Sequence, residues 1–557
     1  MGSQGECGQG YRFVRALQLQ RHRRAALAAA ASFTLVAAAV APAVADTVPP
    51  AGTPATVSVD PLPTAQVNGV VWSMATVGDT VYATGDFTKA RPAGVAEGGV
   101  GEVARQNLLA FNLTTGALTS FNHTLNGQGL RVVASPDGSR VYVGGDFTQV
   151  DGLPQTRLAA FDTATGDLIT SFKPTISNRV RGIAATASTV YFGGNFFNVN
   201  GKSRTRLAAV KAADGTNIDT WRPTADDDEV FALAMAPGNQ RVIVGGKFQN
   251  MNGAPKVGIG AVDAGTGATA PWSSRPIPTK SGSSFSYVTD LNVQGNTVFG
   301  AADGEGGHWF DGRFAADASD GTLVWLDNCY GATYGIYASG QTVYSVSHAH
   351  DCTSLGAFPE SSPTTWHRAL AETTAATGTD KGAPGSNSNY NKQPVPSLLH
   401  YFPTLAIGSY TKQYQAAWAV TGNSDYVAMG GEFPRVNGKA QAGLVRFAVK
   451  SIAPNKSGPV VADLAAPTAS KQFLSTKIKV SWKATWDMDN ANLTYEVLRD
   501  GATTAIGTVS SASTFWTKPS LSFTDSTAPK GAHTYKIRVK DPFGNAITSA
   551  VSNSVSN

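Results

Sequence analysis

Charged residues, cysteine and histidine are all scarce in this sequence. Of its 557 residues only 15% are Asp, Glu, Lys or Arg, and there are three cysteines and eight histidines. The formal charge of +5 arises almost entirely within residues 1–45, which contain five arginines and one glutamate, and the remainder has no dense basic cluster. Electrostatic binding to nucleic acid or to an anionic membrane requires such a cluster. The sequence therefore predicts no nucleic-acid partner.

Long apolar runs, helical periodicity and familiar catalytic motifs are missing as well. Beyond residue 45 no apolar run reaches the roughly 18 residues that span a bilayer, and no stretch keeps the 3.6-residue apolar period of a helical solenoid. Neither H-E-x-x-H nor G-x-S-x-G stands near the histidines. Cys329 and Cys352 are not adjacent, as the cysteines of a quinone-dependent dehydrogenase would be. These absences argue against a helical array, a membrane anchor in the mature chain and a quinone-dependent enzyme.

Residues 1–45 have the pattern of a cleavable signal peptide. Three arginines between positions 21 and 24 precede an alanine-rich apolar stretch, and Ala43-Val44-Ala45 has the small residues of a cleavage site. A retained membrane anchor is the rival interpretation, but the apolar stretch is short and built mostly of alanine. The sequence predicts a secreted, extracellular protein that begins at Asp46. Arg23-Arg24 leaves open whether export uses the general or the twin-arginine route.

One phrase recurs along the rest of the chain. Its fullest form is Val-Tyr-x-Gly-Gly-Asp-Phe, and most copies are about 45–60 residues apart, the length of one four-stranded propeller blade. Two of the seven copies are degenerate. The copies begin at Val81, Val141, Val190, Val242, Val298, Val343 and Val427.

Turn residues after each copy predict the order of strands. Asn200-Gly201 is one of several Asx-Gly pairs that supply the positive φ of a tight hairpin. An apolar strand follows, then a second turn such as Thr165-Gly166, and a last strand that ends in aromatic-x-Pro-Thr, as in Phe172 to Thr175. We expect four strands in each repeat. Because Asp146 has a counterpart in most copies, we expect that position to stabilise its blade rather than to catalyse.

The two ends of the repeat array complement each other. Residues 61–64, Pro-Leu-Pro-Thr, resemble the end of a fourth strand without the three strands before it, whereas the seventh repeat stops after its third strand at residues 443–447. We therefore expect residues 55–60 to pair with that third strand and to close a ring. Closure removes exposed sheet edges, which otherwise promote aggregation.

These phrases resemble the delta-60 type repeats of secreted bacterial propellers. The resemblance covers about residues 56–449, and repeats five and six depart from it because they lose Gly-Gly-Asp-Phe and carry longer insertions. The resemblance implies a seven-bladed β-propeller over residues 46–449. It implies no catalytic residues.

The C-terminal part is similar to fibronectin type III domains. Residues 450–463 are a polar connector, and residues 464–557 contain alternating strands with Trp482 as the expected core tryptophan and Tyr535 as the expected corner tyrosine. The expected fold class is all-β, with a seven-bladed β-propeller followed by an immunoglobulin-like β-sandwich. We expect this sandwich to fold alone and to act mainly as a spacer.

Five histidines lie between positions 308 and 400, in repeats five and six and the segment after them. Alternation along a strand places His348 and His350 on one side, as a metal site or an acid–base site requires. Hydrogen bonding of the insertion to the ring, ligand or metal binding, and hydrolysis all remain open. The candidate ligand-binding residues are His308, Asp311, His348, His350, Asp351 and His367.

Two further sites follow from residue chemistry. Cys329 and Cys352 are predicted to form a disulfide, because both should emerge on one face of the sixth blade and export supplies an oxidising compartment. A run of four acidic residues offers the hard oxygen ligands of a Ca²⁺ site, although it lacks the spacing of a dedicated calcium loop and also fits a solvated turn. That run is Asp226, Asp227, Asp228 and Glu229. No other cofactor is expected.

The sequence favours a secreted binding or scaffold protein whose propeller face recognises a saccharide or another surface polymer. Aromatic residues near the histidines would suit stacking on sugars, although propeller aromatics more often pack between blades. The alternative is an extracellular hydrolase or lyase that acts on a polysaccharide over blades five and six. Two carboxylates that converge in one pocket would indicate such an enzyme. The ligand and the oligomeric state stay open. The aromatic residues are Trp309, Tyr330, Tyr334 and Trp366.

Overall fold

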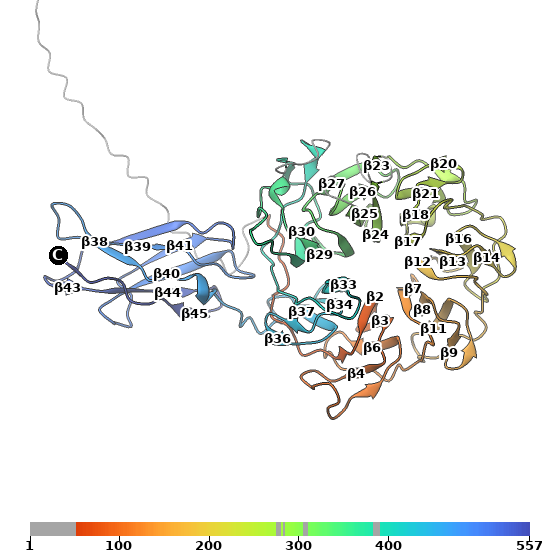
Figure 1. Ribbon diagram of the computed structural model, residues 1–557, viewed down its shortest axis with the longest axis horizontal. Coiled ribbons are helices and arrows are strands. Elements are labelled where there is room, and N and C mark those ends of the chain that lie inside the picture. The colour runs from red at the N-terminus through yellow and green to blue at the C-terminus, as the bar shows by residue number, and fades with distance from the viewer. Residues whose placement is uncertain (1–51, 274–279, 282–283, 305–309, 383–389) are drawn as a thin grey trace, which may run out of the picture. The chain divides into compact units, whose positions relative to one another are not determined.

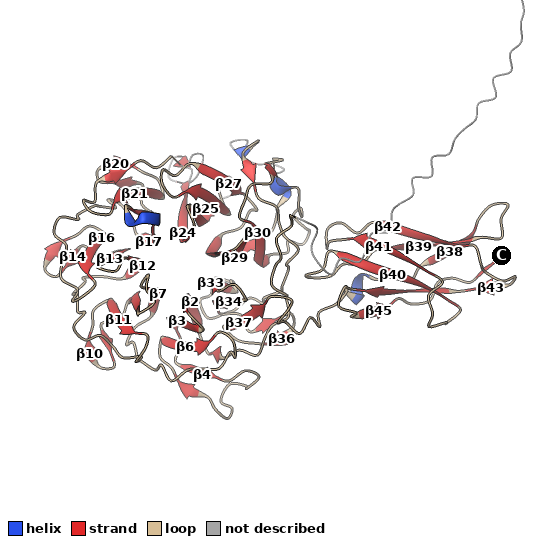
Figure 2. Ribbon diagram, turned by 180° about the vertical axis from the view of Figure 1, so that it is seen from behind, coloured by secondary structure: helices blue, strands red, loops and turns tan. Residues whose placement is uncertain are grey.

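A computed structural model of the chain describes residues 52–273, 280–281, 284–304, 310–382 and 390–557. This part of the protein is all-β, as the sequence predicted, and strands dominate the view in Figure 2. Within it, no helix is long and apolar enough to cross a membrane. The predicted signal peptide, His308 and Trp309 lie outside the described residues. Three short 3-10 turns have described bounds: η1 (Pro237–Asn239), η2 (Thr353–Leu355) and η4 (Val461–Asp463).

Seven antiparallel sheets among the described residues share one strand order, in which the second strand lies between the first and the third. Each Val-Tyr-x-Gly-Gly phrase forms the second strand. The sheets are β2 (Val70–Val77), β3 (Thr80–Asp86) and β6 (Leu108–Asn112); β7 (Gly129–Ala134), β8 (Arg140–Gly145) and β11 (Leu158–Asp162); β12 (Val180–Ala185), β13 (Thr189–Gly194) and β16 (Leu207–Lys211); β17 (Val230–Met235), β18 (Arg241–Gly246), β21 (Ile259–Asp263) and β22 (Thr269–Ala270); β23 (Lys280–Ser281), β24 (Ser284–Gln294), β25 (Thr297–Gly304), β26 (Arg313–Asp317) and β27 (Leu323–Asp327); β28 (Thr333–Ser339), β29 (Thr342–Ala349) and β30 (His367–Thr373); and β33 (Ala417–Gly422), β34 (Tyr426–Gly431) and β37 (Leu444–Ala448).

These sheets form a closed ring. The first strands contact one another in the order β2, β7, β12, β17, β24, β28 and β33, and β33 contacts β2 again. In Figure 1 the first strands of the sheets lie nearest the centre of the ring. The core consists of apolar clusters that each join two neighbouring sheets, such as the cluster in which Tyr142 packs with Val180 and Ile183. Burial of these side chains is the main stabilising contribution.

The first glycine of each Gly-Gly pair lets neighbouring sheets pack closely. A Cβ atom on Gly144 would lie 2.7 Å from Cγ1 of Val180 in the next sheet, and one on Gly193 would lie 2.4 Å from Cγ1 of Val230. Real Cβ atoms do not approach so closely, so alanine would force the sheets apart. The repeat therefore keeps glycine at the position where a valine of the next blade is inserted.

Most repeats carry a two-residue hairpin between their second and third strands, which the sequence did not predict as a separate element. The Asx-Gly pairs form its tip, with φ of 49° at Asn200 and 75° at Gly201. The Oδ1 atom of Asn200 accepts a hydrogen bond from the Thr175 N–H at 2.7 Å, so the hairpin is tied to the Pro-Thr phrase before it. The short strands of these hairpins are β9 (Gln149–Val150) with β10 (Leu153–Pro154), β14 (Asn198–Val199) with β15 (Lys202–Ser203), β19 (Asn250–Met251) with β20 (Ala254–Pro255), β35 (Arg435–Val436) with β36 (Lys439–Ala440), and, in the first repeat, β4 (Lys89–Arg91) with β5 (Val103–Ala104), to which β1 (Gln66–Val67) is added. A further short pair, β31 (Gly378–Thr379) with β32 (Pro394–Val395), follows the third strand of the sixth sheet instead.

The expected fourth strand is reduced in most of the described repeats. In the second repeat it is a single bridge between Phe161 and Leu168, and comparable bridges occur in three other repeats. Only β22 and β27 are regular strands at this position. Proline in the aromatic-x-Pro-Thr phrase has no N–H for a ladder, which explains why the outer strand stays short.

The N-terminal segment closes the ring, as predicted. Antiparallel bridges join Val57 to Val449 and Leu62 to Arg446, at the third strand of the last sheet. The Leu62 N–H donates to the Arg446 carbonyl at 2.9 Å. The buried Arg446 guanidinium also donates to the carbonyls of Pro63, Leu113 and Thr114. One side chain therefore connects the last strand, the closing segment and the first sheet.

Residues 464–557, here called the C-terminal module, form two antiparallel sheets with a shared apolar core. Trp482 and Tyr535 are buried in this core, as expected. The Tyr535 hydroxyl donates to Oδ2 of Asp525 at 2.9 Å rather than to a backbone carbonyl. The strands are β38 (Thr468–Lys471), β39 (Ile478–Lys483) and β42 (Ser520–Asp525) in one sheet, β41 (Gly507–Ala512), β40 (Asn492–Arg499), β44 (Tyr535–Lys540) and β45 (Ala546–Thr548) in the other, and the pair β43 (Ala532–His533) and β46 (Val555–Ser556).

The C-terminal module contacts the ring of sheets more closely than a spacer requires. Phe515 and Trp516 of the module pack in one apolar cluster with Phe358 and Phe402 of the ring. The Phe402 N–H also donates to the Met488 carbonyl at 3.0 Å. The sequence prediction rested on the polar connector between the two parts. The observed contact with the ring is made by loops of the C-terminal module.

Candidate binding site in the central channel

Each of the seven first strands has a β-bulge at the same point. In β2 the pairing register moves by one residue between Val71 and Ser73, so Trp72 is the extra residue. The same shift occurs in β7, β12, β17, β24, β28 and β33. A bulge redirects one side chain, and bulges are frequent beside functional sites. The bulge residues are Trp72, Leu130, Arg181, Phe231, Thr289, Tyr334 and Trp418.

The second glycine of the Gly-Gly pair accommodates the bulge. A Cβ atom on Gly145 would lie 2.3 Å from the Gln128 carbonyl oxygen, and one on Gly431 would lie 2.1 Å from the Ala416 carbonyl oxygen. Both oxygens belong to backbone just before a bulge. Because glycine has no Cβ, its backbone can lie close to the backbone that precedes the bulge. The repeated glycine therefore permits the bulge, which directs one side chain toward the channel.

All seven bulge residues line a single cavity in the centre of the ring, with a volume of about 460 Å³. Ligand sites in proteins commonly have volumes of about 300–1,000 Å³. Four of the seven residues are aromatic. Tyr334 and Trp72 flank Trp418, at ring-centroid distances of 4.4 and 5.0 Å. The three rings form one continuous surface, which we call the aromatic wall below.

The tryptophans of the aromatic wall are held in place by hydrogen bonds. Trp72 Nε1 donates to Oε1 of Gln128 at 3.0 Å, and Nε2 of Gln128 donates to Oδ2 of Asp146 at 2.7 Å. Trp418 Nε1 donates to Oε1 of Glu432 at 3.3 Å. Asp146 and Glu432 occupy the recurrent acidic position of the repeat. At these two copies the position orients channel residues.

An ion pair crosses the channel. Arg131 NH1 lies 2.6 Å from Oδ1 of Asp290, and these residues belong to β7 and β24, which are not neighbours in the ring. The other carboxylate oxygen of Asp290 accepts the Ile336 N–H at 3.2 Å. The cavity therefore combines an aromatic wall with a fixed pair of opposite charges, which suits a ligand that has both apolar faces and hydroxyl groups.

Of the predicted site residues, His348 lies beside the channel. It occupies the recurrent acidic position in the sixth sheet, and its ring meets that of Tyr334 edge to face at 5.9 Å. Its Nε2 atom accepts the Ala332 N–H at 3.1 Å. Burial, aided by the positive charge of Arg368, lowers the pKa of His348 to about 4, so the imidazole is neutral near pH 7. His348 therefore supports the aromatic wall as a hydrogen-bond acceptor.

The other predicted residues contact separate partners. His350 stacks on Tyr330, and Asp351 Oδ1 accepts the Thr353 N–H at 2.9 Å. His367 stacks on Phe515 at 4.6 Å, in the contact with the C-terminal module. The structure therefore disperses these side chains. Alternation along a strand indicated which side each occupies, but not what faces it from the next element.

Asp311 is held by backbone in the fifth sheet. Its Oδ2 atom accepts the Gly331 N–H at 2.9 Å, and its own N–H donates to Oδ1 of Asn328. Burial and the nearby charge of Asp303 raise the pKa of Asp311 well above its ordinary value. Asp303 lines the central cavity and accepts the hydroxyl of Tyr287 at 2.6 Å. Asp311 thus lies behind the channel lining rather than in it.

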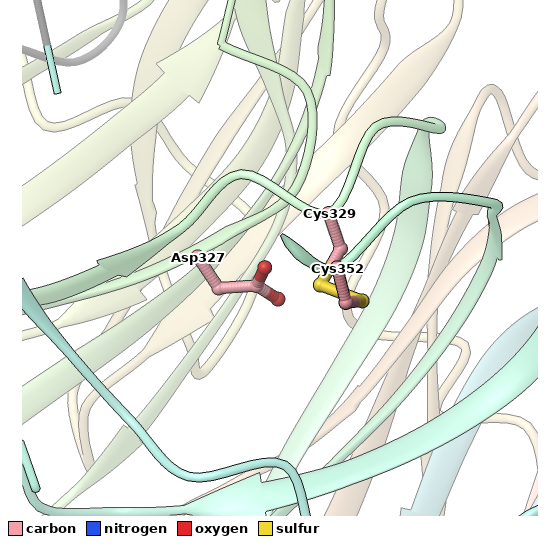
Figure 3. Close-up of side chains that lie close together, drawn as sticks. All are labelled: Asp327, Cys329 and Cys352. Atoms are coloured by element: carbon pink, nitrogen blue, oxygen red, sulfur yellow. A yellow bond between two sulfur atoms is a disulfide. The ribbon is translucent and has the colours of Figure 1, made fainter. Parts of the chain in front are cut away.

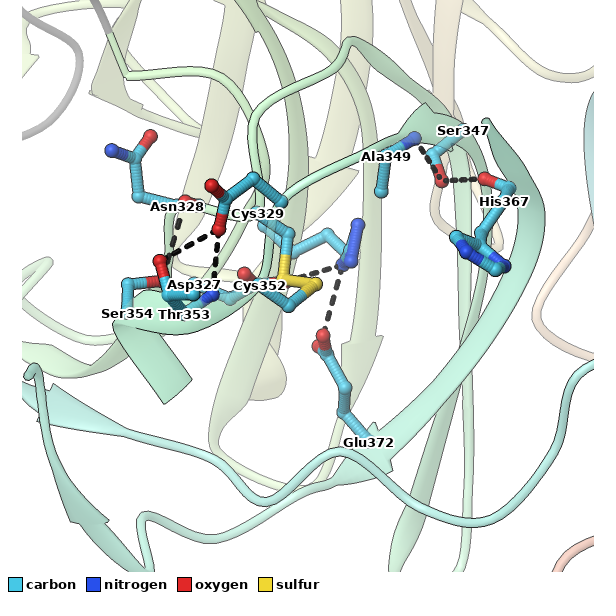
Figure 4. The surroundings of a disulfide bond; sticks show 12 residues. Asp327, Asn328, Cys329, Ser347, Ala349, Cys352, Thr353, Ser354, His367 and Glu372 are labelled. Atoms are coloured by element: carbon cyan, nitrogen blue, oxygen red, sulfur yellow. Dashed lines mark hydrogen bonds and ion pairs between the residues drawn. A yellow bond between two sulfur atoms is a disulfide. The ribbon is translucent and has the colours of Figure 1, made fainter. Parts of the chain in front are cut away.

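The predicted disulfide between Cys329 and Cys352 is present, with Cα atoms 4.1 Å apart (Figure 3). Hydrogen bonds of the neighbouring segments surround it, including Ser354 Oγ to the Asn328 carbonyl at 3.3 Å (Figure 4). Asp327 and the two cysteines are the one group of at least three His, Cys, Asp or Glu residues in the described part of the chain that lies within metal-ligand distance. Because the two sulfur atoms are bonded to each other, neither can act as a thiolate ligand of a metal ion.

The four acidic residues proposed for Ca²⁺ each have their own partner. Asp226 Oδ2 accepts the Gly253 N–H and Asp227 Oδ1 accepts the Gln249 N–H, both at 2.8 Å. Glu229 pairs with Arg179 at 2.8 Å. The remaining residue, Asp228, accepts the next backbone N–H. A calcium site in this run stays a prediction, and its geometry offers no convergent ligands.

Sequence reasoning missed most of the channel lining, although a signal was present. The bulge residues stand 13 or 15 positions before the second glycine of the Gly-Gly pair, or before the residue that occupies that position in copies without the pair, but their residue types vary between copies. Residue types shared between the repeats therefore do not mark these positions. Among the aromatic residues named from the sequence, Tyr334 lines the channel, whereas Trp366 is exposed.

No known protein family and no curated protein matches the sequence. Among solved structures, the chain is similar to one from "Crystal Structure of Mitotic Checkpoint Complex", with 12% identity and a TM-score of 0.40 over 71% of this chain and 96% of that chain. This likeness carries no function across to the present chain.

Proposed function

We propose that the protein is a secreted seven-bladed β-propeller with a fibronectin type III-like C-terminal module, and that its central channel binds a saccharide. One observation carries the proposal: a repeated bulge directs seven different side chains into one cavity. The backbone repeats while the side chains vary, as expected when a regular scaffold presents a specific set of contacts.

A saccharide suits the chemistry of the cavity. A pyranose ring has an apolar C–H face, which can pack on the aromatic wall of Trp72, Tyr334 and Trp418, and hydroxyl groups around its edge. Arg131 and Asp290, on the two strands that border that wall, place donors and acceptors within the same cavity. An apolar lining with a few fixed polar groups is typical of small-ligand sites. A single sugar or the end of a chain would fit this volume better than a long polymer laid across the ring.

The lining carboxylates favour binding over hydrolysis. Glycoside hydrolysis usually needs one carboxylic acid and one free carboxylate on opposite sides of the bond. Asp290 is engaged by Arg131, and Asp303 accepts the hydroxyl of Tyr287. The hydrolase or lyase over blades five and six remains the alternative, but its predicted residues contact separate partners.

Polysaccharide retention tests the proposal. Mature protein would be incubated with chitin, peptidoglycan, cellulose and β-1,3-glucan, and both retained protein and released reducing ends would be measured. We expect retention without release, and Trp418→Ala should weaken affinity about tenfold or more, since it removes the centre of the aromatic wall. The matched control, Trp366→Ala, changes an exposed tryptophan outside the cavity and should bind normally.

Reducing ends released in proportion to protein would favour the enzyme instead. Retention unchanged by Trp418→Ala would place binding outside the channel and refute the proposal.

Export has its own test, because the secreted protein should begin at Asp46. Residues 1–45 and the disulfide support that expectation, since disulfides persist in oxidising compartments.

A further inference from the structure

The hairpin between β38 and β39 of the C-terminal module exposes two large apolar side chains at its tip. Phe473 and Leu474 are adjacent, and 91% of the surface of each is exposed. The Ser475 N–H donates to the Gln472 carbonyl at 3.2 Å, so the two apolar residues are the central residues of a tight turn. Neither side chain belongs to the apolar core of the module. Their burial therefore contributes nothing to the stability of the fold.

This turn is built from unusual residues. Leu474 has a φ of 52°, and turns usually place glycine or asparagine at a position with positive φ. Other tight turns of the chain follow that rule, as at Asn437-Gly438 in the ring and at Asp500-Gly501 in the same module. The Phe-Leu pair thus suits the turn less well than Asn-Gly would and gains no burial in return. A contact outside the chain explains its presence better than the fold does.

Three exposed lysines flank the tip. Lys471 precedes the turn, and Lys477 and Lys479 follow it. The Gln472 N–H donates to the Lys477 carbonyl at 2.9 Å, so Lys471 and Lys477 stand on facing strands beside the turn. In the described part of the module the ion pairs involve other cations, so the charges of these three lysines are not neutralised. The paired cations are Arg499, Lys518, His533, Arg538 and Lys540.

The hairpin lies at the opposite end of β39 from the contact with the ring. β39 begins at Ile478, directly after Lys477, and ends at Lys483, three residues before Trp486, which packs in the cluster shared with the ring. A strand of six residues is about 20 Å long. The tip can therefore contact a surface while the module stays attached to the ring.

A membrane surface fits this arrangement better than a folded partner does. Two protruding side chains offer far less area than the roughly 800 Å² that each partner buries in a stable protein interface. The interface of a bilayer accepts apolar side chains to a depth of about 5–10 Å, and anionic headgroups attract lysines at its edge. Because the chain lacks a dense basic cluster, charge alone would bind weakly, and the apolar tip adds the second contribution.

We propose that the hairpin of β38 and β39 attaches the protein to a membrane surface that contains anionic lipids. Phe473 and Leu474 insert among the headgroups, and Lys471, Lys477 and Lys479 contact the lipid phosphates through their long, flexible side chains. The attachment is peripheral, because only the tip of one hairpin enters the bilayer. This proposal is independent of saccharide binding in the channel.

Co-sedimentation of the mature protein with lipid vesicles tests the proposal. One set of vesicles would contain phosphatidylcholine alone, and the other equal parts of phosphatidylcholine and phosphatidylglycerol. We expect binding to the mixed vesicles that weakens as salt is added, because salt screens the lysines from the headgroups. Binding to phosphatidylcholine alone should be much weaker.

Variants separate the apolar tip from the charges. The double variant Phe473→Asn with Leu474→Gly should weaken binding to mixed vesicles about tenfold or more, since it removes both inserted side chains. Its Tm should stay the same or rise, because Asn-Gly suits the turn. Changing Lys471, Lys477 and Lys479 together to glutamine should abolish the preference for anionic vesicles. Val100→Ser is the matched control, because Val100 is 96% exposed but has no lysine beside it, and it should bind normally.

Insertion has a direct readout as well. Phe473→Cys places a single free thiol in the mature chain, since Cys329 and Cys352 are bonded to each other, and it can be labelled with a fluorophore that responds to polarity. Its emission should shift to shorter wavelength when mixed vesicles are added. No vesicle binding, or binding that the Asn-Gly variant retains in full, would overturn the proposal. Binding without the emission shift would indicate a purely electrostatic contact and would overturn it too.

Discussion

Arg313 shows how strongly one residue can depend on its surroundings. Its side chain is fully buried, with Nε 2.7 Å from Oδ2 of Asp327 and 3.2 Å from Oε1 of Glu372. Burial raises the pKa of Glu372 well above its ordinary value despite the attraction of the arginine. Both carboxyl groups rely on the same cation, because water does not reach them.

Arg313→Met should therefore lower the free energy of unfolding by about 3–5 kcal/mol, since it leaves Asp327 and Glu372 without their buried counter-ion. Urea denaturation would measure the change. Lys202→Met is the control, because its ion pair with Asp219 is half exposed and such pairs contribute about 0–1 kcal/mol. An equal loss in both variants would contradict this account.

His367 should make the protein sensitive to acid. Burial against Phe358 and Phe515 lowers its pKa to about 4, below the ordinary 6.5. Between those values the unfolded chain binds a proton that the folded state excludes, so stability falls as the pH drops from 6.5 toward 4. His367→Phe should make that fall shallower without abolishing it, because His348 and His400 have similarly lowered pKa values, as measured by denaturation at pH 7 and pH 5.

His533 provides a control of opposite sign. The Asp500 carboxylate raises its pKa, so its contribution to stability is present at low pH and is lost as the pH rises through the raised value. Removing His533 should therefore leave the acid sensitivity in place or steepen it. A flatter acid response in His533→Phe would count against the assignment to His367.

The partner of a residue could be predicted from the sequence where only one partner was chemically possible. The prediction failed where the partner came from a distant strand. Cys329 and Cys352 had no competing cysteine outside residues 1–45, so their pairing could be predicted. His348 and His367 are close in sequence, yet one faces Tyr334 and the other Phe515. Local spacing contains no information about such partners.

At the scale of elements, the glycine pairs have two separate functions. The first glycine admits a valine of the next sheet, and the second accommodates the bulge of its own sheet. Strand order, turn positions and ring closure could be predicted because they depend on local turn chemistry and repetition. The bulges and short hairpins could not, since they depend on how two strands pair across the sheet.

Gly431→Ala should disturb the aromatic wall through the backbone. The added Cβ would lie 2.1 Å from the Ala416 carbonyl oxygen, so the bulge that presents Trp418 would have to move. We expect a loss of about 1–3 kcal/mol in stability and a change in tryptophan fluorescence. In Gly378→Ala the Cβ would meet only Val395, at an ordinary 3.6 Å, so this control should be nearly neutral.

At the scale of the whole molecule, the C-terminal module has a core of its own but shares an apolar surface with the ring. Trp482 and Tyr535 belong to the internal core, whereas Trp486, Phe515 and Trp516 pack with Phe358 and other ring residues. Folding alone and contact with the ring are therefore compatible. Separation would expose large aromatic side chains.

A fragment that begins at Val461 should melt cooperatively and should also bind a dye specific for exposed apolar surface, unlike the full chain. Calorimetry and dye fluorescence would measure the two properties. Phe515→Ser in the fragment should reduce dye binding with little effect on its melting, because Phe515 lies outside the internal core. A fragment that fails to melt cooperatively would mean that the ring completes the core.

The closure of the ring by its N-terminal segment determines when folding can finish. Arg446 and Pro63, which are hydrogen-bonded, lie 383 positions apart. The segment made first during synthesis has no partner until almost the whole ring has been made. Compared with closing one repeat, joining ends so far apart adds only about 2 kcal/mol of chain entropy, because the cost grows with the logarithm of length. Until then β37 keeps an open edge that can pair with another chain. The earliest residues of the ring to leave the ribosome are thus the last to be incorporated, and the nascent chain is most prone to aggregation just before that step.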